Sequence, residues 1–159
     1  PGECSKEYCR RSRVVGVKMC QHHREIACRT SMLQAQKRRA MRERLPDERQ
    51  GLTHHFEITD RNGVAHDGYI QTGCYPDGRV GEIFVKIGKS GDMMAVYDTW
   101  AIAASVALQH GAPMESFFQK FVGSKFEPSG STKNKEIPRC TSPVDYVARF
   151  ILMKFGKEQ

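Results

Sequence analysis

The stretch that most constrains the fold of this chain runs from residue 81 to residue 111. It opens with a run of β-branched and aromatic residues, which pack well on a pleated surface and predict a strand: Ile83, Phe84, Val85 and Ile87. A glycine-containing turn follows, and then an apolar helical pattern about eighteen residues long that Gly111 and Pro113 close. A strand, a turn and a mostly buried helix predict a domain core. The stretch holds no acid–base or nucleophile–base pair, so it does not by itself indicate an enzyme.

The segments around this core predict a small α+β domain. Two strands at 52–59 and 65–75 flank an Asn62-Gly63 turn, which is a strong hairpin signal, and 81–87 supplies the third strand. Helices are predicted at 113–122 and at 142–155, the latter with Ser142 as N-cap and Pro143 at its first position. Residues 123–140 read as a long loop that is functional or pinned to the surface. We expect a three-stranded antiparallel meander packed with three helices.

The positive charge of the chain lies in its first third. Residues 1–50 contain 13 Lys and Arg against 6 Asp and Glu, whereas residues 51–159 contain 12 of each kind. A basic segment attached to a neutral domain is typical of proteins that contact nucleic acid. The alternative is a tail that improves solubility on a protein that binds something else. We expect nucleic acid as the partner, DNA more than RNA.

Clustered cysteines in the same segment predict a structural zinc ion. The spacing Cys4-x4-Cys9-x10-Cys20-x2-His23 supplies three thiolates and one imidazole, a closed tetrahedral ligand set. His22 and Cys28 are alternative fourth ligands. Few apolar residues surround the cluster, so zinc binding and folding should be one event. The pattern resembles the small fingers that begin many phage-type and mobile-element proteins.

A basic helix is expected at about 31–45, between this zinc module and the α+β domain, which gives two domains at 1–45 and 46–159. Its cations and those of the finger loop would meet phosphates: Lys37, Arg38, Arg39 and Arg42 with Arg10, Arg11, Arg13 and Lys18. A solvated linker helix is the competing interpretation.

Other candidate sites are weaker. The turn Lys89-Ser90-Gly91 lacks the first glycine of a phosphate-binding loop, since Ile83 stands there, but a helix N-terminus beside it could hold an anion or nucleotide. The competing interpretation is a plain strand-to-helix turn. His54 matches no nuclease spacing, so a structural role is favoured. Cys74 and Cys140 form a redox pair only if the fold brings them together. Tyr97, Trp100 and the phenylalanines have the spacing of core residues.

Residues 43–155 resemble the C-terminal region (TSCPD-type domain) of adenosylcobalamin-dependent, class II ribonucleotide reductases. The landmarks are RLPDER at 44–49, LTH at 52–54, GYI at 68–70, GEIF at 81–84, Lys89-x-Gly91, ALQHG at 107–111, FEPSG at 126–130 and Thr141-Ser142-x-x-Asp145-Tyr146. The resemblance implies the fold of residues 50–157. Those reductases carry their radical-forming cysteine and cobalamin site in a large barrel, for which 159 residues leave no room, and the redox cysteine pair expected at their tail is missing. We therefore carry over no catalytic residue and expect a detached domain.

These observations favour a non-enzymatic, zinc-containing nucleic-acid-binding or regulatory adaptor of phage or mobile-element origin, with protein contacts or a homodimer through the reductase-like domain. One alternative is an accessory or split-off subunit of a ribonucleotide reductase that binds the large subunit or a nucleotide. Another is an inhibitor of a host protein or a sponge for a signalling nucleotide. No apolar run approaches the length of a membrane span, and a charged N-terminus predicts a cytoplasmic protein without membrane contact.

Overall fold

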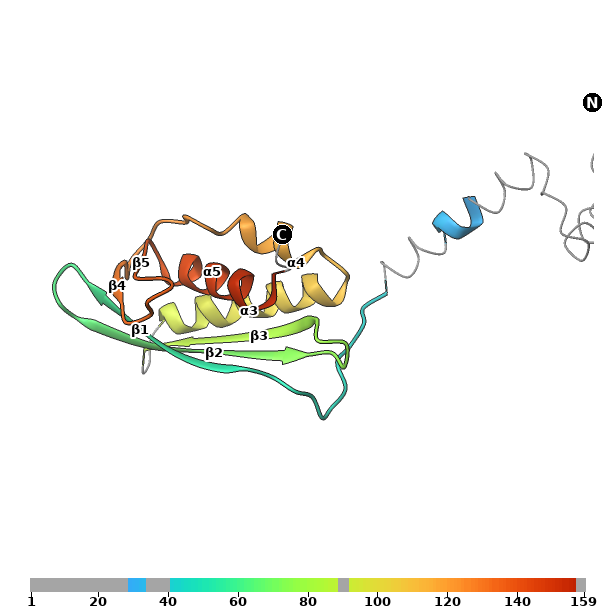
Figure 1. Cartoon of the computed structure of the whole chain (residues 1–159), viewed down its shortest axis with the longest axis horizontal. Coiled ribbons are helices and arrows are strands. Elements are labelled where there is room, and N and C mark those ends of the chain that lie inside the picture. Colours follow the sequence, from blue (N-terminus) through green and yellow to red (C-terminus); the bar gives the residue numbers. More distant parts are fainter. Residues whose placement is uncertain (1–28, 34–40, 89–91, 157–159) are drawn as a thin grey trace, which may run out of the picture. The chain divides into compact units, whose positions relative to one another are not determined.

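The computed structural model describes residues 29–33, 41–88 and 92–156 (Figure 1). Contacts divide the chain into two units, Pro1–Met41 and Arg42–Gln159. The described part of the first unit consists of a helical turn at 29–33 and Met41. The second unit contains β1 (Thr53–Asp60), β2 (Ala65–Cys74), β3 (Val80–Ile87), α3 (Asp92–Gln109), α4 (Met114–Gln119), β4 (Gly130–Thr132), β5 (Arg139–Cys140) and α5 (Pro143–Phe155).

The sheet is antiparallel throughout and has five strands in the order β3-β2-β1-β4-β5. The three predicted strands are present, and β1 and β2 pair around the Asn62-Gly63 turn, where Gly63 has a φ of 77°. The expectation of three strands is nevertheless wrong for the sheet as a whole. Within the segment predicted to be a loop, β4 pairs with β1 and β5 pairs with β4.

All the helices of the second unit lie on one side of the sheet (Figure 1). The strands alternate accordingly: Ile70 on β2 is buried, whereas its neighbour Tyr69 on the opposite face is exposed. The inward side chains of β1, β2 and β3 pack against Tyr97 and Ala101 of α3 and against α5. The fold is therefore α+β, with one sheet face covered by helices.

The edge strand β3 is covered by hydrogen bonds from α3. The buried hydroxyl of Ser105 accepts from the backbone N–H of Ile83 at 2.9 Å, and the buried amide of Gln109 donates to the carbonyl of Gly81 at 3.0 Å. Unpaired backbone groups at a sheet edge otherwise invite pairing with another chain. Helix α3 thus satisfies backbone groups at the start of this edge while it covers the sheet.

Helix α3 also has a largely apolar outer face, which carries Asp98 as its charged residue and which the described part of the chain does not cover. Val96 is 57% exposed and Ile102 is 55% exposed, and Ala95 and Ala103 beside them are exposed as well. The prediction of a mostly buried helix therefore holds only for the side that faces the sheet. Tyr97 is buried, and Trp100 packs edge-on against Phe121, which confirms that these aromatic residues belong to the core.

The two later helices agree with the sequence pattern in different degrees. Helix α4 is shorter than predicted, because it ends at Gln119 and turns replace its last residues. Helix α5 spans the predicted residues, with Ser142 as N-cap and Pro143 at the first position. Among the described residues, no helix is both long and apolar enough to cross a membrane.

Candidate functional site

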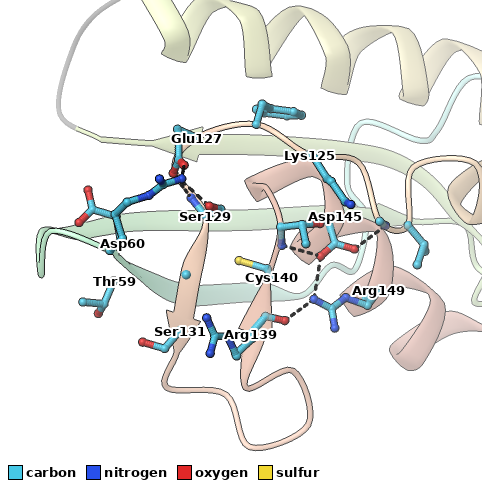
Figure 2. Close-up of a pocket in the computed structure, with 16 residues that line it drawn as sticks. Thr59, Asp60, Lys125, Glu127, Ser129, Ser131, Arg139, Cys140, Asp145 and Arg149 are labelled. Atoms are coloured by element: carbon cyan, nitrogen blue, oxygen red, sulfur yellow. Dashed lines mark hydrogen bonds and ion pairs between the residues drawn. The ribbon is translucent and has the colours of Figure 1, made fainter.

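A pocket of about 1000 Å³ lies where β1, β4 and β5 meet the first turns of α5 (Figure 2). Three segments far apart in the sequence build it: the end of β1, the chain from Val122 to Ser131, and β5 with α5. Its lining residues are Thr59, Asp60, Arg61, Val122, Gly123, Lys125, Phe126, Glu127, Ser129, Gly130, Ser131, Arg139, Cys140, Thr141, Asp145 and Arg149.

Asp145 ties these segments together. Its side chain is buried and accepts hydrogen bonds from the backbone N–H groups of Gly123 at 2.8 Å and Thr141 at 3.0 Å. Arg149, one turn later, donates to the same carboxylate at 2.7 Å. Burial alone would raise the pKa of Asp145, but these hydrogen bonds outweigh it and hold the pKa below its ordinary value. The carboxylate is therefore ionised and fully engaged.

The start of α5 explains why this carboxylate stands where it does. Ser142 caps the helix, and its hydroxyl accepts from the N–H of Asp145 at 3.0 Å. Asp145 in turn reaches back to the N–H of Thr141, just before the cap, in a variant of the reciprocal capping box. The landmark Thr141-Ser142-x-x-Asp145 is thus a helix start that also anchors the loop at Gly123.

The other carboxylates of the pocket are also occupied. Glu127 accepts from the backbone N–H of Ser129 at 2.8 Å and from Arg61 at 2.6 Å, and these bonds, the one from Ser129 first, lower its pKa. Asp60 accepts from the N–H groups of Asn62 and Val64 in the hairpin turn and contacts His66 at 3.1 Å. The pKa of Asp60 is lowered, first by the bond from Val64. The pocket's negative charges are therefore balanced inside the protein.

The cations of the pocket are not all balanced in this way. The side chains of Lys125 and Arg139 are exposed and have no hydrogen-bond or ion-pair partner within the described part of the chain. Arg149 donates through Nη2 to Asp145 and to the carbonyl of Arg139, but its buried Nε has no partner among the described residues. The pocket thus contains positive charge that no described carboxylate pairs with, an arrangement suited to an anion.

A second, smaller cavity of about 390 Å³ lies beside His54. The ring of His54 stacks on Phe150, with centroids 4.1 Å apart, and its Nε2 lies 2.9 Å from the hydroxyl of Tyr146, which also accepts from the amide of Asn134. Burial, together with Lys154 and His55, lowers the pKa of His54. These contacts agree with the predicted structural role of His54.

The two cysteines of the second unit are free thiols on strands that are not neighbours. Cys74 lies on β2 and Cys140 on β5, with β1 and β4 between them. Three strand spacings across the sheet already amount to about 14 Å, and the two residues also lie at opposite ends of the strands, so they are well beyond the reach of a disulfide. The redox pair considered from the sequence is therefore not formed.

Most of the site residues predicted from the sequence lie outside the described residues. This applies to the zinc ligands Cys4, Cys9, Cys20 and His23 with the alternatives His22 and Cys28, to the phosphate-contacting Arg10, Arg11, Arg13, Lys18, Lys37, Arg38 and Arg39, and to Lys89, Ser90 and Gly91. Within the described ranges no three His, Cys, Asp or Glu residues gather in a possible metal site. The zinc site and the nucleic-acid contacts stay predictions.

Arg42 is the exception, because the structure describes it. Its Nε donates to the side-chain oxygen of Gln109 at 2.6 Å, and the neighbouring Glu43 N–H donates to the carbonyl of Gln109 at 2.8 Å. Tyr75 donates its hydroxyl to the carbonyl of Glu43. Residues 42–45 are thus held against the end of α3 and β3, although the predicted division of the chain at residue 46 is not tested by these contacts.

Sequence reasoning missed the pocket residues themselves. Lys125, Phe126 and Arg139 lie in the segment predicted as a loop. Arg149 lies in a helix that was predicted from its apolar face and its N-cap, neither of which indicates a role for the arginine. The usable signal was the unusual length of that segment, which suggested a function without naming a residue.

The comparisons with known proteins place this fold in a family. The TSCPD domain family matches residues 36–154, and the chain belongs to that family. The predicted relation to B12-dependent ribonucleotide reductases is confirmed. The chain is 45% identical over 115 residues to the vitamin B12-dependent ribonucleotide reductase of Rhodopirellula baltica and 37% identical over 132 residues to that of Streptomyces coelicolor.

The similarity covers most of this chain and little of those reductases. It spans 72% of the chain and 11% of the Rhodopirellula protein, and 82% of the chain and 13% of the Streptomyces protein. The reductase of Streptantibioticus cattleyicolor is 39% identical over 118 residues, which are 74% of the chain and 19% of that protein. No solved structure matches the chain.

Proposed function

We propose that this protein acts as the TSCPD domain of a B12-dependent ribonucleotide reductase and docks on the reductase's catalytic part. The observation that carries the proposal is the 45% identity to a reductase over a region that makes up only 11% of that enzyme. A domain kept at that identity beside a much larger catalytic part is expected to work with it. The proposal applies whether this domain is part of the same polypeptide as the catalytic part or binds the catalytic part as a separate chain.

The outer face of α3 supports this proposal and supplies the docking surface. Val96 and Ile102 are more than half exposed, and the only described charged side chain between Met94 and Gln109 is Asp98. An apolar helix face of this kind is usually covered in the assembled protein. The occupant we propose is the catalytic part of the reductase, because the relatives carry it beside this domain.

The alternatives have less support. The hypothesis of a nucleic-acid-binding zinc adaptor rests mainly on residues 1–40. The comparisons favour a relation to the reductases over this hypothesis and over a phage or mobile-element origin. Zinc binding by Cys4, Cys9, Cys20 and His23 is compatible with either function. A non-enzymatic role is also part of the proposal, because the matched region is a small fraction of each reductase.

The test uses the Rhodopirellula reductase from which the matching 115-residue region has been removed. The full 159-residue chain is added to it as a separate protein or fused in the position of the deleted region, and complex formation and reductase turnover are measured. We expect restored turnover or a stable complex. The double variant Val96→Glu/Ile102→Glu should abolish the effect, whereas Val64→Glu, at another exposed apolar residue, should not. No complex and no change in turnover in either format would refute the proposal.

A further inference from the structure

We propose that the pocket at the start of α5 binds a nucleotide, with the phosphates held by Lys125, Arg139 and Arg149 and the base packed against Phe126. The inference goes beyond the proposed docking function and does not depend on it, because it rests on the pocket alone. The residues come from three segments that β4, β5 and Asp145 hold in place (Figure 2).

The balance of charge selects an anion. Four basic side chains line the pocket against three carboxylates, and all three carboxylates already accept hydrogen bonds from the protein. Arg61 forms an ion pair with Glu127, and Arg149 forms an ion pair with Asp145. Lys125 and Arg139 have no such partner among the described residues. A cationic ligand would meet positive charge and find no free carboxylate here.

The donor groups select oxygen acceptors such as those of phosphate. Arg149 is held by Asp145 and by the carbonyl of Arg139, so its guanidinium has a defined orientation before a ligand arrives. A preoriented guanidinium, together with two cations that have no partner among the described residues, suits a di- or triphosphate.

The aromatic wall distinguishes a nucleotide from a plain inorganic anion. Phe126 is 39% exposed, lines the pocket and follows Lys125 directly in the sequence. Behind it lies the buried ring of Tyr97, with centroids 6.4 Å apart and planes 22° apart, which supports the ring of Phe126 from the core side. An exposed aromatic ring beside cations offers a stacking surface for a base next to charges for its phosphates. The volume of about 1000 Å³ admits a ligand of that size.

The experiment is a calorimetric titration of the full 159-residue chain, in the absence of any reductase, with three probes: ATP, tripolyphosphate without a base, and adenosine without phosphates. We expect ATP to bind saturably and more tightly than either of the other two. Binding of ATP should weaken when the salt concentration is raised, because ion pairs with phosphates are screened.

Matched variants separate the pocket from the general positive charge of the chain. Lys125→Gln/Arg139→Gln should weaken ATP binding by about tenfold or more, since it removes two charge-assisted contacts. Lys120→Gln/Lys135→Gln removes the same charge at exposed residues that do not line the pocket, and should leave affinity nearly unchanged. Phe126→Leu should weaken ATP binding but not tripolyphosphate binding. All these side chains are exposed, so thermal melts should show folded variants.

Three results would overturn the inference: no saturable binding of ATP, equal losses in the two charge variants, or equal affinity for ATP and tripolyphosphate. The last would indicate an inorganic polyphosphate site in place of a nucleotide site. Failure of this inference is distinguishable from failure of the docking proposal. The docking test measures turnover and complex formation, and its variants change Val96 and Ile102, neither of which lines the pocket.

Discussion

Replacement of the buried Asp145 by asparagine should strongly destabilise the second unit. The wild-type carboxylate accepts three hydrogen bonds, from the amides of Gly123 and Thr141 and from Arg149. Asparagine has nearly the same shape but only one acceptor oxygen. If that oxygen serves Thr141 and Arg149, the new NH₂ group points at the N–H of Gly123, and two donors face each other.

The expected loss follows from these contacts. Leaving the N–H of Gly123 without an acceptor costs about 1–3 kcal/mol. The bonds from Thr141 and Arg149 lose their charge assistance, at about 1 kcal/mol each, and the share of Arg149 is discounted because its side chain is 33% exposed. The sum is about 3 kcal/mol, which for a unit of this size lowers Tm by roughly 10 °C.

The assay is urea denaturation of the full chain, followed by far-UV circular dichroism, for the wild type, Asp145→Asn and the control Asp98→Asn on the exposed side of α3. The control should change the free energy of unfolding by less than about 0.5 kcal/mol. Because the folded-state pKa of Asp145 lies below its ordinary value of 3.8, wild-type stability should also fall as pH drops below 3.8, and the variant should lose this component. A loss below about 1 kcal/mol for Asp145→Asn would refute the anchoring role.

Two further changes test the packing of the sheet against α5. Because the folded-state pKa of His54 lies below its ordinary value of 6.5, its contribution to stability is complete above pH 6.5 and declines as the pH falls below that value. The variant His54→Phe keeps the ring stack, so in urea denaturation it should lose less stability than the wild type between about pH 7.5 and about pH 5.5. An identical loss of stability in both proteins would contradict this. Gly68→Ala would place a Cβ 2.5 Å from the ring of Phe56, which is buried and stacked on Tyr146. We therefore expect the free energy of unfolding to fall by about 1–3 kcal/mol in the same assay. A fall of less than about 0.5 kcal/mol would show that Phe56 can shift.

The elements that sequence reasoning predicted well are those encoded by neighbouring residues. The hairpin turn at Asn62-Gly63 follows from the ease with which these residues take positive φ, and the structure gives Gly63 that conformation. The start of α5 follows from a serine cap and a proline at the next position, and both are where they were expected. Each signal spans only a few residues, so the chain's distant parts do not alter it.

The pocket could not be predicted because it depends on pairing between distant residues. Strand β4 has only three residues and no alternating apolar pattern, and it is a strand because Ile58 lies opposite Thr132, 74 positions later in the sequence. Strand β5 is shorter still and needs β4 in place first. Only that arrangement brings Arg139 and Arg149 to the same cavity as Lys125.

Helix α3 shows a different limit. Its apolar composition correctly predicts that the helix packs against the rest of the domain, but hydrophobicity alone does not tell which of its apolar residues are buried. Tyr97 and Ala101 are covered by this chain's own sheet, whereas Val96 and Ile102, with the same apolar character, are more than half exposed. Since a free chain gains nothing from an exposed isoleucine on an almost uncharged helix, the simplest physical reason for this face is a partner surface. This is the face that we propose docks on the catalytic part of a reductase.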